Sequence, residues 1–398
     1  MLAREAEVTL LLKASYYPII AIIGPRQAGK STLAKKLFPQ KPYCSLEDWD
    51  NRQFATDDPR RFLAQFHQGA ILDEVQHCPA LFSYLQTLVD QQQEKGLFIL
   101  TGSQQFSLMA NLTQSLAGRV GLIQLLPFTL TELQQGQYAP AEIEPLLFNG
   151  CYPPIYDKKI PSPYWMSDYV MTYLERDVRQ LIHIQDLRVF HRFLQMCAVR
   201  TGQLLNLSNL ASDCGITHNT AKAWLSVLEA SYLVFLLSPH HRNFNKRLVK
   251  TSKIYFYDTG LACFLAGIQS SEQLIAHPMR GSLFETWVVS ELIKRRFNQG
   301  VMSDLYFWRD RQGHEVDVLI EQGAQLIPVE IKSGKTIASD YFDSLEYWST
   351  LSQQSQITSW LIYAGNVSQE RSKAKVLSWS DIAQLDLALK NNGDKSSS

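Results

Sequence analysis

A short glycine-containing segment is the strongest sign of chemistry in this sequence. It follows the spacing G-x-x-x-x-G-K-[ST] and consists of Gly24, Pro25, Arg26, Gln27, Ala28, Gly29, Lys30 and Ser31. Its two glycines let the backbone turn its N–H groups toward a phosphate, and the positive end of the following helix adds to the attraction. Lys30 would contact the β- and γ-phosphates, and the Ser31 hydroxyl would bind Mg²⁺. The segment therefore predicts a nucleotide site with Mg²⁺.

Two adjacent acidic residues, Asp73 and Glu74, follow an apolar run and complete this prediction. Asp73 is expected to hold the hydration shell of the Mg²⁺, and Glu74 to polarise an attacking water. The alternative is that the pair only caps the next helix. We expect ATP rather than GTP, because the guanine-reading tetrad N-K-x-D is absent and its nearest match, residues 245–248, lacks the carboxylate.

Two further residues are candidates for contact with the γ-phosphate. Ser103 comes directly after the apolar run 97–100 and Thr101-Gly102, where a polar sensor residue would lie. Arg119 could act as an arginine finger, within the chain or across a subunit contact, by cancelling charge on the phosphoryl group. The alternatives are an ordinary turn serine and a surface ion pair.

A second set of charged residues lies near the C-terminal end, on two β-like runs. Side chains alternate between the faces of a strand, so a two-residue loop at 322–323 or 323–324 places Asp317 and Glu330 on one face of a hairpin. Lys332, two positions beyond Glu330, shares that face. Clustered carboxylates suit Mg²⁺ or Mn²⁺, and a nearby ammonium could orient a water for attack on a phosphodiester. The alternative is a solvent-facing hairpin of alternating charge.

Glu285 precedes this hairpin in a long amphipathic segment and could add a ligand to the same metal. The residues next to the hairpin carboxylates are strongly apolar, which indicates a largely covered hairpin. Bare charges in a covered position need a partner or a metal. We therefore expect a metal site made by Glu285, Asp317 and Glu330, with Lys332 as a catalytic residue.

The elements that would position these residues differ along the chain. Up to about residue 127, apolar runs at 18–23, 70–72 and 97–100 alternate with helical spacing, which predicts an α/β fold with a mainly parallel sheet. The run 149–154, NGCYPP, cannot lie inside a helix or a central strand and indicates a boundary. We therefore expect an ATPase domain at 1–149, a helical region at 150–268, a third α/β domain at 269–390 and a disordered tail at 391–398.

The middle region contains the pattern of a helix-turn-helix. One short helix from Leu207 would end at Gly215, and a second would begin near Thr217. The β-like runs that follow would form a wing with a basic strip, which contains Arg242, Lys246, Arg247, Lys250 and Lys253. Such a strip suits the backbone of double-stranded DNA. The alternative is a winged helix that binds only protein.

Composition sets the limits for these predictions. At 398 residues the chain is long enough for two or three domains. Its 38 basic and 38 acidic residues give no net charge that would argue for a nucleic-acid or membrane partner. The six cysteines lie far apart, no apolar run is long enough to cross a bilayer, and the N-terminus does not read as a signal peptide. We expect a cytoplasmic protein without a membrane partner.

The motifs together resemble a prokaryotic family of AAA+-type ATPases that carry a C-terminal domain of unknown function with a restriction-endonuclease-like core. The resemblance covers nearly the whole chain and rests on GPRQAGKST, ILDEVQ, TGSQ, SLAGRV, YLERD, the helix-turn-helix, DTGL and the C-terminal charged set. It implies nucleotide binding by residues 24–32, including Thr32, and by Asp73. It also implies a PD-(D/E)xK-like arrangement of Asp317, Glu330 and Lys332.

Two functions follow from these predictions. One is an ATP-dependent, DNA-associated protein with a nuclease-like C-terminal domain. The other is a signalling or defence-type ATPase switch, whose winged helix and C-terminal domain bind proteins without cleavage. The motifs leave the oligomeric state open, and only an arginine finger that acts in trans would require a second subunit.

Overall fold

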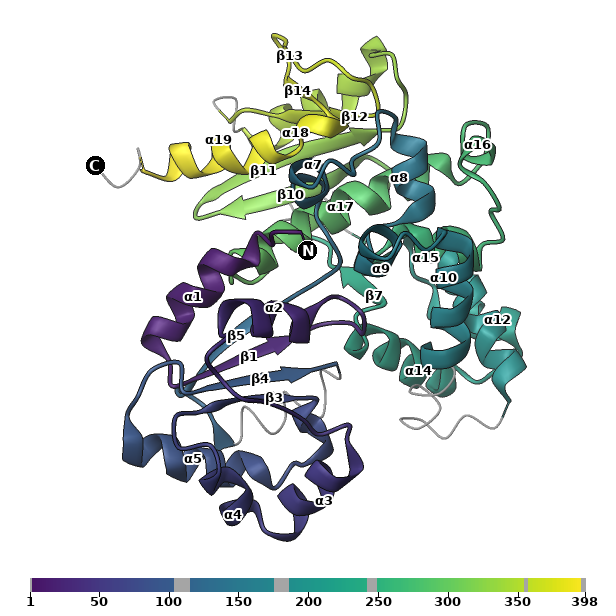
Figure 1. Cartoon of the computed structure of the whole chain (residues 1–398). Helices are drawn as coiled ribbons and strands as arrows, with labels where there is room; N and C mark the ends of the chain where they lie inside the picture. Colours follow the sequence, from purple (N-terminus) through teal and green to yellow (C-terminus); the bar gives the residue numbers. More distant parts are fainter. Residues whose placement is uncertain (1, 104–114, 175–185, 242–248, 354–356, 395–398) are drawn as a thin grey trace.

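The computed structural model describes residues 2–103, 115–174, 186–241, 249–353 and 357–394. Three regions follow one another along the chain, and in Figure 1 they surround a central helix. The first is a sheet with helices, the second is mainly helical, and the third is a sheet with helices again.

A five-stranded parallel sheet forms the centre of the first region, in the order β2-β3-β4-β1-β5. Its strands are β1 (Ile19–Ile23), β2 (Tyr43–Ser45), β3 (Ala70–Asp73), β4 (Phe98–Gly102) and β5 (Val120–Gln124). Its helices are α1 (Ala6–Tyr16), α2 (Lys30–Leu37), α3 (Trp49–Asp57), α4 (Pro59–Ala64), α5 (Leu81–Gln92) and the 3₁₀ turn η1 (Val75–His77). Ile20 and Ile22 pack with α1 and α2, whereas Ile19 and Ile23 belong to the core that includes α5. Because β1 is buried on both faces, the predicted parallel α/β fold is confirmed.

Helices dominate the second region. They are α7 (Leu130–Gln135), α8 (Ile143–Asn149), α9 (Pro153–Asp157), α10 (Ser162–Tyr169) with the π-helical turn η2 (Val170–Leu174), α12 (Leu187–Ala198), α13 (Leu207–Cys214), α14 (His218–Ala230), α15 (Thr259–Leu265) and α16 (Ser271–Leu274). A small antiparallel sheet joins β6 (Gln203–Leu204), β8 (Lys253–Phe256) and β7 (Val234–Leu237). Helices α13 and α14 form the predicted helix-turn-helix pair: α13 ends at Gly215, which has φ +70°, and Thr217 caps α14.

The third region is a six-stranded mixed sheet with the order β13-β14-β12-β11-β10-β9. Its strands are β9 (Leu305–Arg309), β10 (Glu315–Gln322), β11 (Gln325–Lys332), β12 (Trp360–Tyr363), β13 (Gln369–Glu370) and β14 (Lys375–Ser378). Its helices are α17 (Arg280–Asn298), α18 (Asp343–Ser352) and α19 (Ala383–Asp394), with the 3₁₀ turns η3 (Ser339–Phe342) and η4 (Trp379–Asp381). Residues 391–394, predicted as the start of a disordered tail, are the end of α19.

Helix α17 is the central helix of Figure 1 and contacts all three regions. It packs against β5 and α1 of the first, β8 and α15 of the second, and β11 of the third. Its residues 286–298 are buried without exception, although the sequence predicts an amphipathic helix with one solvated face. Other regions of the chain cover the face of α17 that was expected to contact water. The polar side chains of that face therefore need hydrogen-bond or charge partners inside the protein.

Two further predictions concern the chain as a whole. All six cysteines lie within the described residues and are buried free thiols. Among the described residues, no helix combines the length and the apolar character that a membrane span requires.

Candidate nucleotide site and C-terminal carboxylates

The glycine-containing loop connects β1 to α2, as the sequence predicts. Gly24 has φ +150°, and a Cβ atom there would lie 2.0 Å from the carbonyl oxygen of Leu125. Gly29, directly before α2, has φ +91°, which side-chain-bearing residues rarely adopt. Both glycines are therefore required by the geometry of the loop.

Lys30 is buried at the start of α2, within the predicted loop. Its Nζ donates to the carbonyl oxygens of Gly24 at 3.0 Å and Pro25 at 2.8 Å. Burial lowers the pKa of Lys30, while the carboxylates of Glu74 and Asp73 act in the opposite direction. An ammonium held only by neutral carbonyls, in a site with two carboxylates, is well placed to exchange these partners for a phosphate.

Asp73 ends β3 and lies beside the loop, where three hydroxyl groups donate to it. Ser31 Oγ donates to its Oδ1 and Tyr43 OH to its Oδ2, each at 2.6 Å, and Thr101 Oγ1 also donates to Oδ1. The sequence predictions include Ser31 but miss Tyr43 and Thr101. The Ser31 hydroxyl and the Asp73 carboxylate are oxygen ligands of the kind that Mg²⁺ prefers, so this pair fits the ion.

Glu74 is buried next to Asp73, with φ +53°. Its Oε2 accepts a hydrogen bond from Ser103 Oγ at 2.8 Å and another from the Gln76 amide. Glu74 occupies the N-cap position of η1, but its side chain makes no capping hydrogen bond. Ser103 is thus beside Glu74, and its predicted role as a sensor of the γ-phosphate stays a prediction. No role was predicted for Gln76, the last residue of the ILDEVQ motif.

A cavity of about 330 Å³ is open beside these residues. Its lining includes most of the predicted loop, from Arg26 and Gln27 to Gly29–Thr32, together with Asp73 and Glu74. Arg4 and Phe128 line it from the first region. Pro153, Pro154, Asp157 and Lys158 line it from the second. Sequence reasoning uses the Pro-containing run only as a boundary, yet α9 forms a wall of the cavity.

Two predicted residues stand apart from this cavity or on its rim. Arg119 is half-buried and pairs with Asp90, its Nε lying 2.5 Å from Oδ1. This is the alternative that the sequence left open, and Arg119 is not part of the cavity lining. Arg26, on the rim, donates to Glu47 and stacks on the ring of Tyr173 at 5.3 Å.

The C-terminal hairpin has the two-residue loop 323–324, because Gln322 pairs with Gln325. This register places Asp317 and Glu330 on one face, as the parity argument predicts. Asp317 Oδ2 accepts from the backbone N–H of Ile331 at 2.8 Å, and Lys332 Nζ donates to Glu330 Oε1 at 2.6 Å. Glu330 is buried, and its other oxygen has no hydrogen-bond partner.

The predicted metal site is not formed by these carboxylates. Lys253 Nζ lies 2.8 Å from Glu285 Oε1 and also pairs with Glu315. Tyr255 donates to Glu285 at 2.5 Å. Within the described residues, no three His, Cys, Asp or Glu side chains are grouped so that they could hold a metal ion. Lysine ammonium groups supply positive charge to this set, and metal binding by Asp317 and Glu330 stays a prediction.

Burial governs the ionisation of this carboxylate set. It raises the pKa of Glu330 to about 8, with the Asp317 charge acting in the same direction and Lys332 in the opposite one. Burial also raises the pKa of Glu285 to about 7, against the attraction of Lys253. Lys253 was predicted in a solvent-exposed basic strip, but it is only 3% exposed and belongs to this set.

Little of the predicted basic strip can be placed. Arg242, Lys246 and Arg247 lie outside the described residues, and so do Glu175 to Asp177 of the YLERD motif. Lys250 is exposed. DNA contact through this strip therefore stays a prediction.

Three family models match the chain. An AAA domain matches residues 16–134, which contain the cavity-lining loop and Asp73. Domains of unknown function match residues 141–272 (DUF8612) and 280–382 (DUF4143). The first match agrees with the chemistry predicted for the loop, and the other two name no activity.

Whole-chain comparisons give relatives and solved structures. The uncharacterized proteins Rv2008c of Mycobacterium tuberculosis and Mb2031c of Mycobacterium bovis are each 31% identical over 337 residues, which is 84% of this chain and 74% of theirs. The Walker-type ATPase PABY2304 of Pyrococcus abyssi is 15% identical with a TM-score of 0.44, over 66% of this chain and 94% of that one. AMPPCP-bound DnaA of Aquifex aeolicus is 14% identical with a TM-score of 0.30, over 56% and 85%.

Proposed function

The chain belongs to the same family as the mycobacterial proteins Rv2008c and Mb2031c, and for this family member we propose an ATPase function. Its AAA-type domain binds ATP with Mg²⁺ and hydrolyses it, which releases the γ-phosphate. The observation that carries the proposal is the convergence of Lys30, Asp73 and Glu74 on one cavity beside the glycine-containing loop. All three side chains are buried. Asp73 and Glu74 are already held by hydrogen bonds, and Lys30 would exchange its two carbonyl partners for the phosphate.

Each residue has a separate task in this proposal. The loop amides and Lys30 bind the phosphate oxygens, and Ser31 and Asp73 would hold Mg²⁺, which neutralises phosphate charge when bound. Glu74 orients the attacking water and accepts its proton. Ser103 and Gln76 both donate to Oε2 of Glu74 and thereby fix the orientation of its carboxylate.

Steady-state release of phosphate from ATP with Mg²⁺ tests hydrolysis. We expect turnover by the wild type and a loss of about 10²- to 10⁴-fold in Glu74→Gln, because the amide cannot accept a proton. Glu74→Gln should still bind ATP, since the phosphate-binding residues are unchanged. Normal turnover by this variant would remove Glu74 from the proposal.

For the C-terminal region we propose a binding role without cleavage, as in the ATPase-switch alternative. The supporting observation is the carboxylate set, in which Lys253 and Lys332 provide the countercharge that a nuclease metal would bring. A nuclease-like role and association with double-stranded DNA are the competing hypotheses, and they need a divalent ion at Asp317 and Glu330.

Calorimetric titration with Mn²⁺ separates these hypotheses. For the carboxylate set we expect no binding, so a nucleotide-free titration should give the same heats for wild type and Asp317→Ala. Binding that Asp317→Ala and Glu330→Ala each abolish would favour the metal-dependent nuclease. Loss of Mn²⁺-dependent DNA cleavage in the same variants would establish it.

A further inference from the structure

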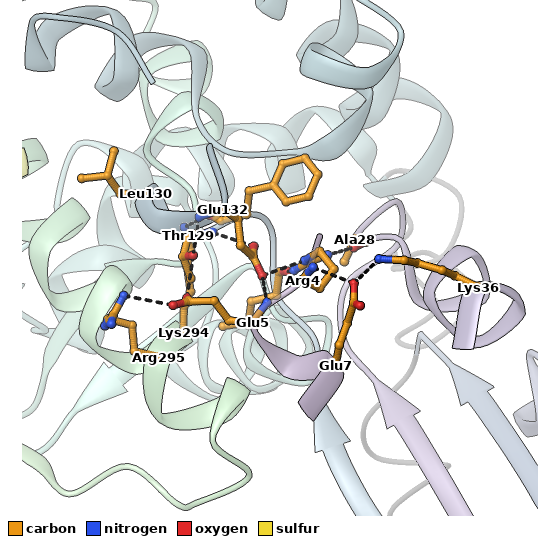
Figure 2. A network of polar contacts seen from close by, with 12 residues as sticks. Arg4, Glu5, Glu7, Ala28, Lys36, Thr129, Leu130, Glu132, Lys294 and Arg295 are labelled. Atoms are coloured by element: carbon orange, nitrogen blue, oxygen red, sulfur yellow. Dashed lines mark hydrogen bonds and ion pairs between the residues drawn. The ribbon is translucent and has the colours of Figure 1, made fainter. Parts of the chain in front are cut away.

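We propose that Arg4 is a positioning residue for the glycine-containing loop and that it couples this loop to helix α17 of the C-terminal region. The inference rests on the proposed nucleotide site and goes beyond it, because Arg4 precedes every motif of that site. Figure 2 shows the polar network that connects the two.

The guanidinium of Arg4 is buried and donates in three directions. Nη1 donates to the carbonyl oxygen of Ala28 at 2.8 Å, and Nη2 to that of Leu126 at 2.6 Å. Nε donates to Glu132 Oε1 at 3.0 Å. Because the guanidinium is planar and its donors form a rigid fork, these contacts fix the position of Ala28 relative to Glu132.

Fixing the Ala28 carbonyl also fixes an amide of the loop. In a trans peptide the C=O and the following N–H point in opposite directions, so the bond from Arg4 sets the direction of the Gly29 N–H. Gly29 lines the cavity and has φ +91°. Because glycine has no side chain, the peptide between Ala28 and Gly29 can rotate more easily than other peptides of the loop. Without Arg4, the Ala28 carbonyl loses a charged donor, and a turn of this peptide would present an oxygen instead of an N–H to the phosphate.

Glu132 connects Arg4 to the start of α7. It forms a capping box with Thr129: Glu132 Oε2 accepts from the Thr129 N–H at 3.0 Å, and Thr129 Oγ1 accepts from the Glu132 N–H. Glu132 Oε1 also accepts from the Glu5 N–H at 2.7 Å, and Thr129 Oγ1 donates to Glu5 Oε2 at 2.7 Å. The N-terminal segment and α7 therefore move as one unit with Arg4.

Helix α17 holds this unit from the other side (Figure 2). Arg295 Nη1 donates to Thr131 Oγ1 at 2.9 Å and lies 3.4 Å from Glu5 Oε1. Glu291 Oε1 accepts from the Leu130 N–H at 2.9 Å, and Lys294 Nζ donates to a carbonyl oxygen of the same segment. The three charged groups of α17 are buried, and Glu5 is half-buried, so these contacts are only weakly screened and tie α17 to residues 129–132.

The α17 end of the network offers a matched pair of arginines. Arg295 and Arg296 are adjacent, buried and both paired with Asp386. Arg295 contacts Glu5 and Thr131, whereas Arg296 contacts Asp304. Replacing either one removes a buried charge of α17, but only Arg295 belongs to the path toward Arg4.

The test measures the dissociation constant of a non-hydrolysable ATP analogue with Mg²⁺ by calorimetry, on the full chain. We expect Arg4→Ala to weaken binding about tenfold and Arg4→Lys to give an intermediate value, because lysine keeps one charged donor. Arg295→Met should weaken binding about threefold or more, and Arg296→Met should stay within about twofold of the wild type. Thermal unfolding of both methionine variants shows whether they are equally destabilised.

The proposal is overturned if Arg295→Met and Arg296→Met bind the analogue equally well, or if Arg4→Ala binds like the wild type. Should a methionine variant fail to fold, the pair Arg295→Lys and Arg296→Lys gives the same comparison. A wild type that binds no analogue contradicts the nucleotide site itself, which is a separate result.

Discussion

At the scale of single residues, the side chains proposed to do the chemistry are held in part by residues to which the sequence assigns no role. Spacing alone identifies Lys30, Ser31 and Asp73, because the loop and the strand end are local features of the sequence. Tyr43 and Thr101 come from the neighbouring strands β2 and β4, which flank β3 in the sheet. Their contact with Asp73 depends on strand order, which no local pattern determines.

The buried carboxyl of Glu291 gives a prediction for the pH dependence of stability. One oxygen accepts from Leu130 and the other has no hydrogen-bond partner, and burial raises its pKa to about 7 against the charges of Lys294 and Arg295, with Glu5 acting in the same direction as burial. The folded state therefore binds more protons than the unfolded chain between pH 4.5, the ordinary pKa of this carboxyl, and about 7. The free energy of unfolding should fall as the pH rises through this window.

Glu291→Gln keeps the acceptor for Leu130 and removes the titration. We expect the variant to gain stability relative to the wild type across this window, by up to roughly 3 kcal/mol at pH 8. Urea unfolding at pH 5 and pH 8 measures the difference. A gap between the two proteins that is the same at both pH values would contradict the prediction.

At the scale of elements, the hairpin of β10 and β11 was predictable and its partner was not. The period of two along a strand places Asp317 and Glu330 on one face for either even loop, and the structure has the loop at 323–324. Lys253 reaches the carboxylates from β8, which is far away in the sequence and packs on α17. Such a contact depends on tertiary packing. From the sequence alone, the basic residues around β8 could therefore be predicted only as part of a basic surface strip.

Lys253 should contribute strongly to stability if it supplies the buried positive charge. Replacing it in Lys253→Met leaves Glu285 and Glu315 without this partner, and we expect a loss of about 3 kcal/mol in the free energy of unfolding. Lys250→Met, at an exposed position of the same segment, is the matched control and should change stability by less than about 0.5 kcal/mol. Equal denaturation midpoints for the two variants would show that Lys253 is a surface residue in solution.

At the scale of the whole molecule, the order of the three regions was predictable, and their packing around α17 was not. Changes in periodicity separate the regions along the chain, although α7 and α8 of the second region precede the Pro-containing run that was predicted as its boundary. In the sequence, the charged residues of α17 have the spacing of the polar face of an amphipathic helix. The sequence does not show that other regions of the chain cover this face. The same packing brings α9 of the second region to the nucleotide cavity, and so the cavity belongs to two regions.

The central claim is that this cavity binds ATP with Mg²⁺ through Lys30. Calorimetric titration of the full chain with ATP and Mg²⁺, beside Lys30→Ala, tests it most directly. We predict binding of ATP to the wild type and a loss of about 100-fold or more in Lys30→Ala, because the charge that holds the β- and γ-phosphates is removed. Equal affinity of the two proteins for ATP, or a wild type that binds none, would contradict the claim.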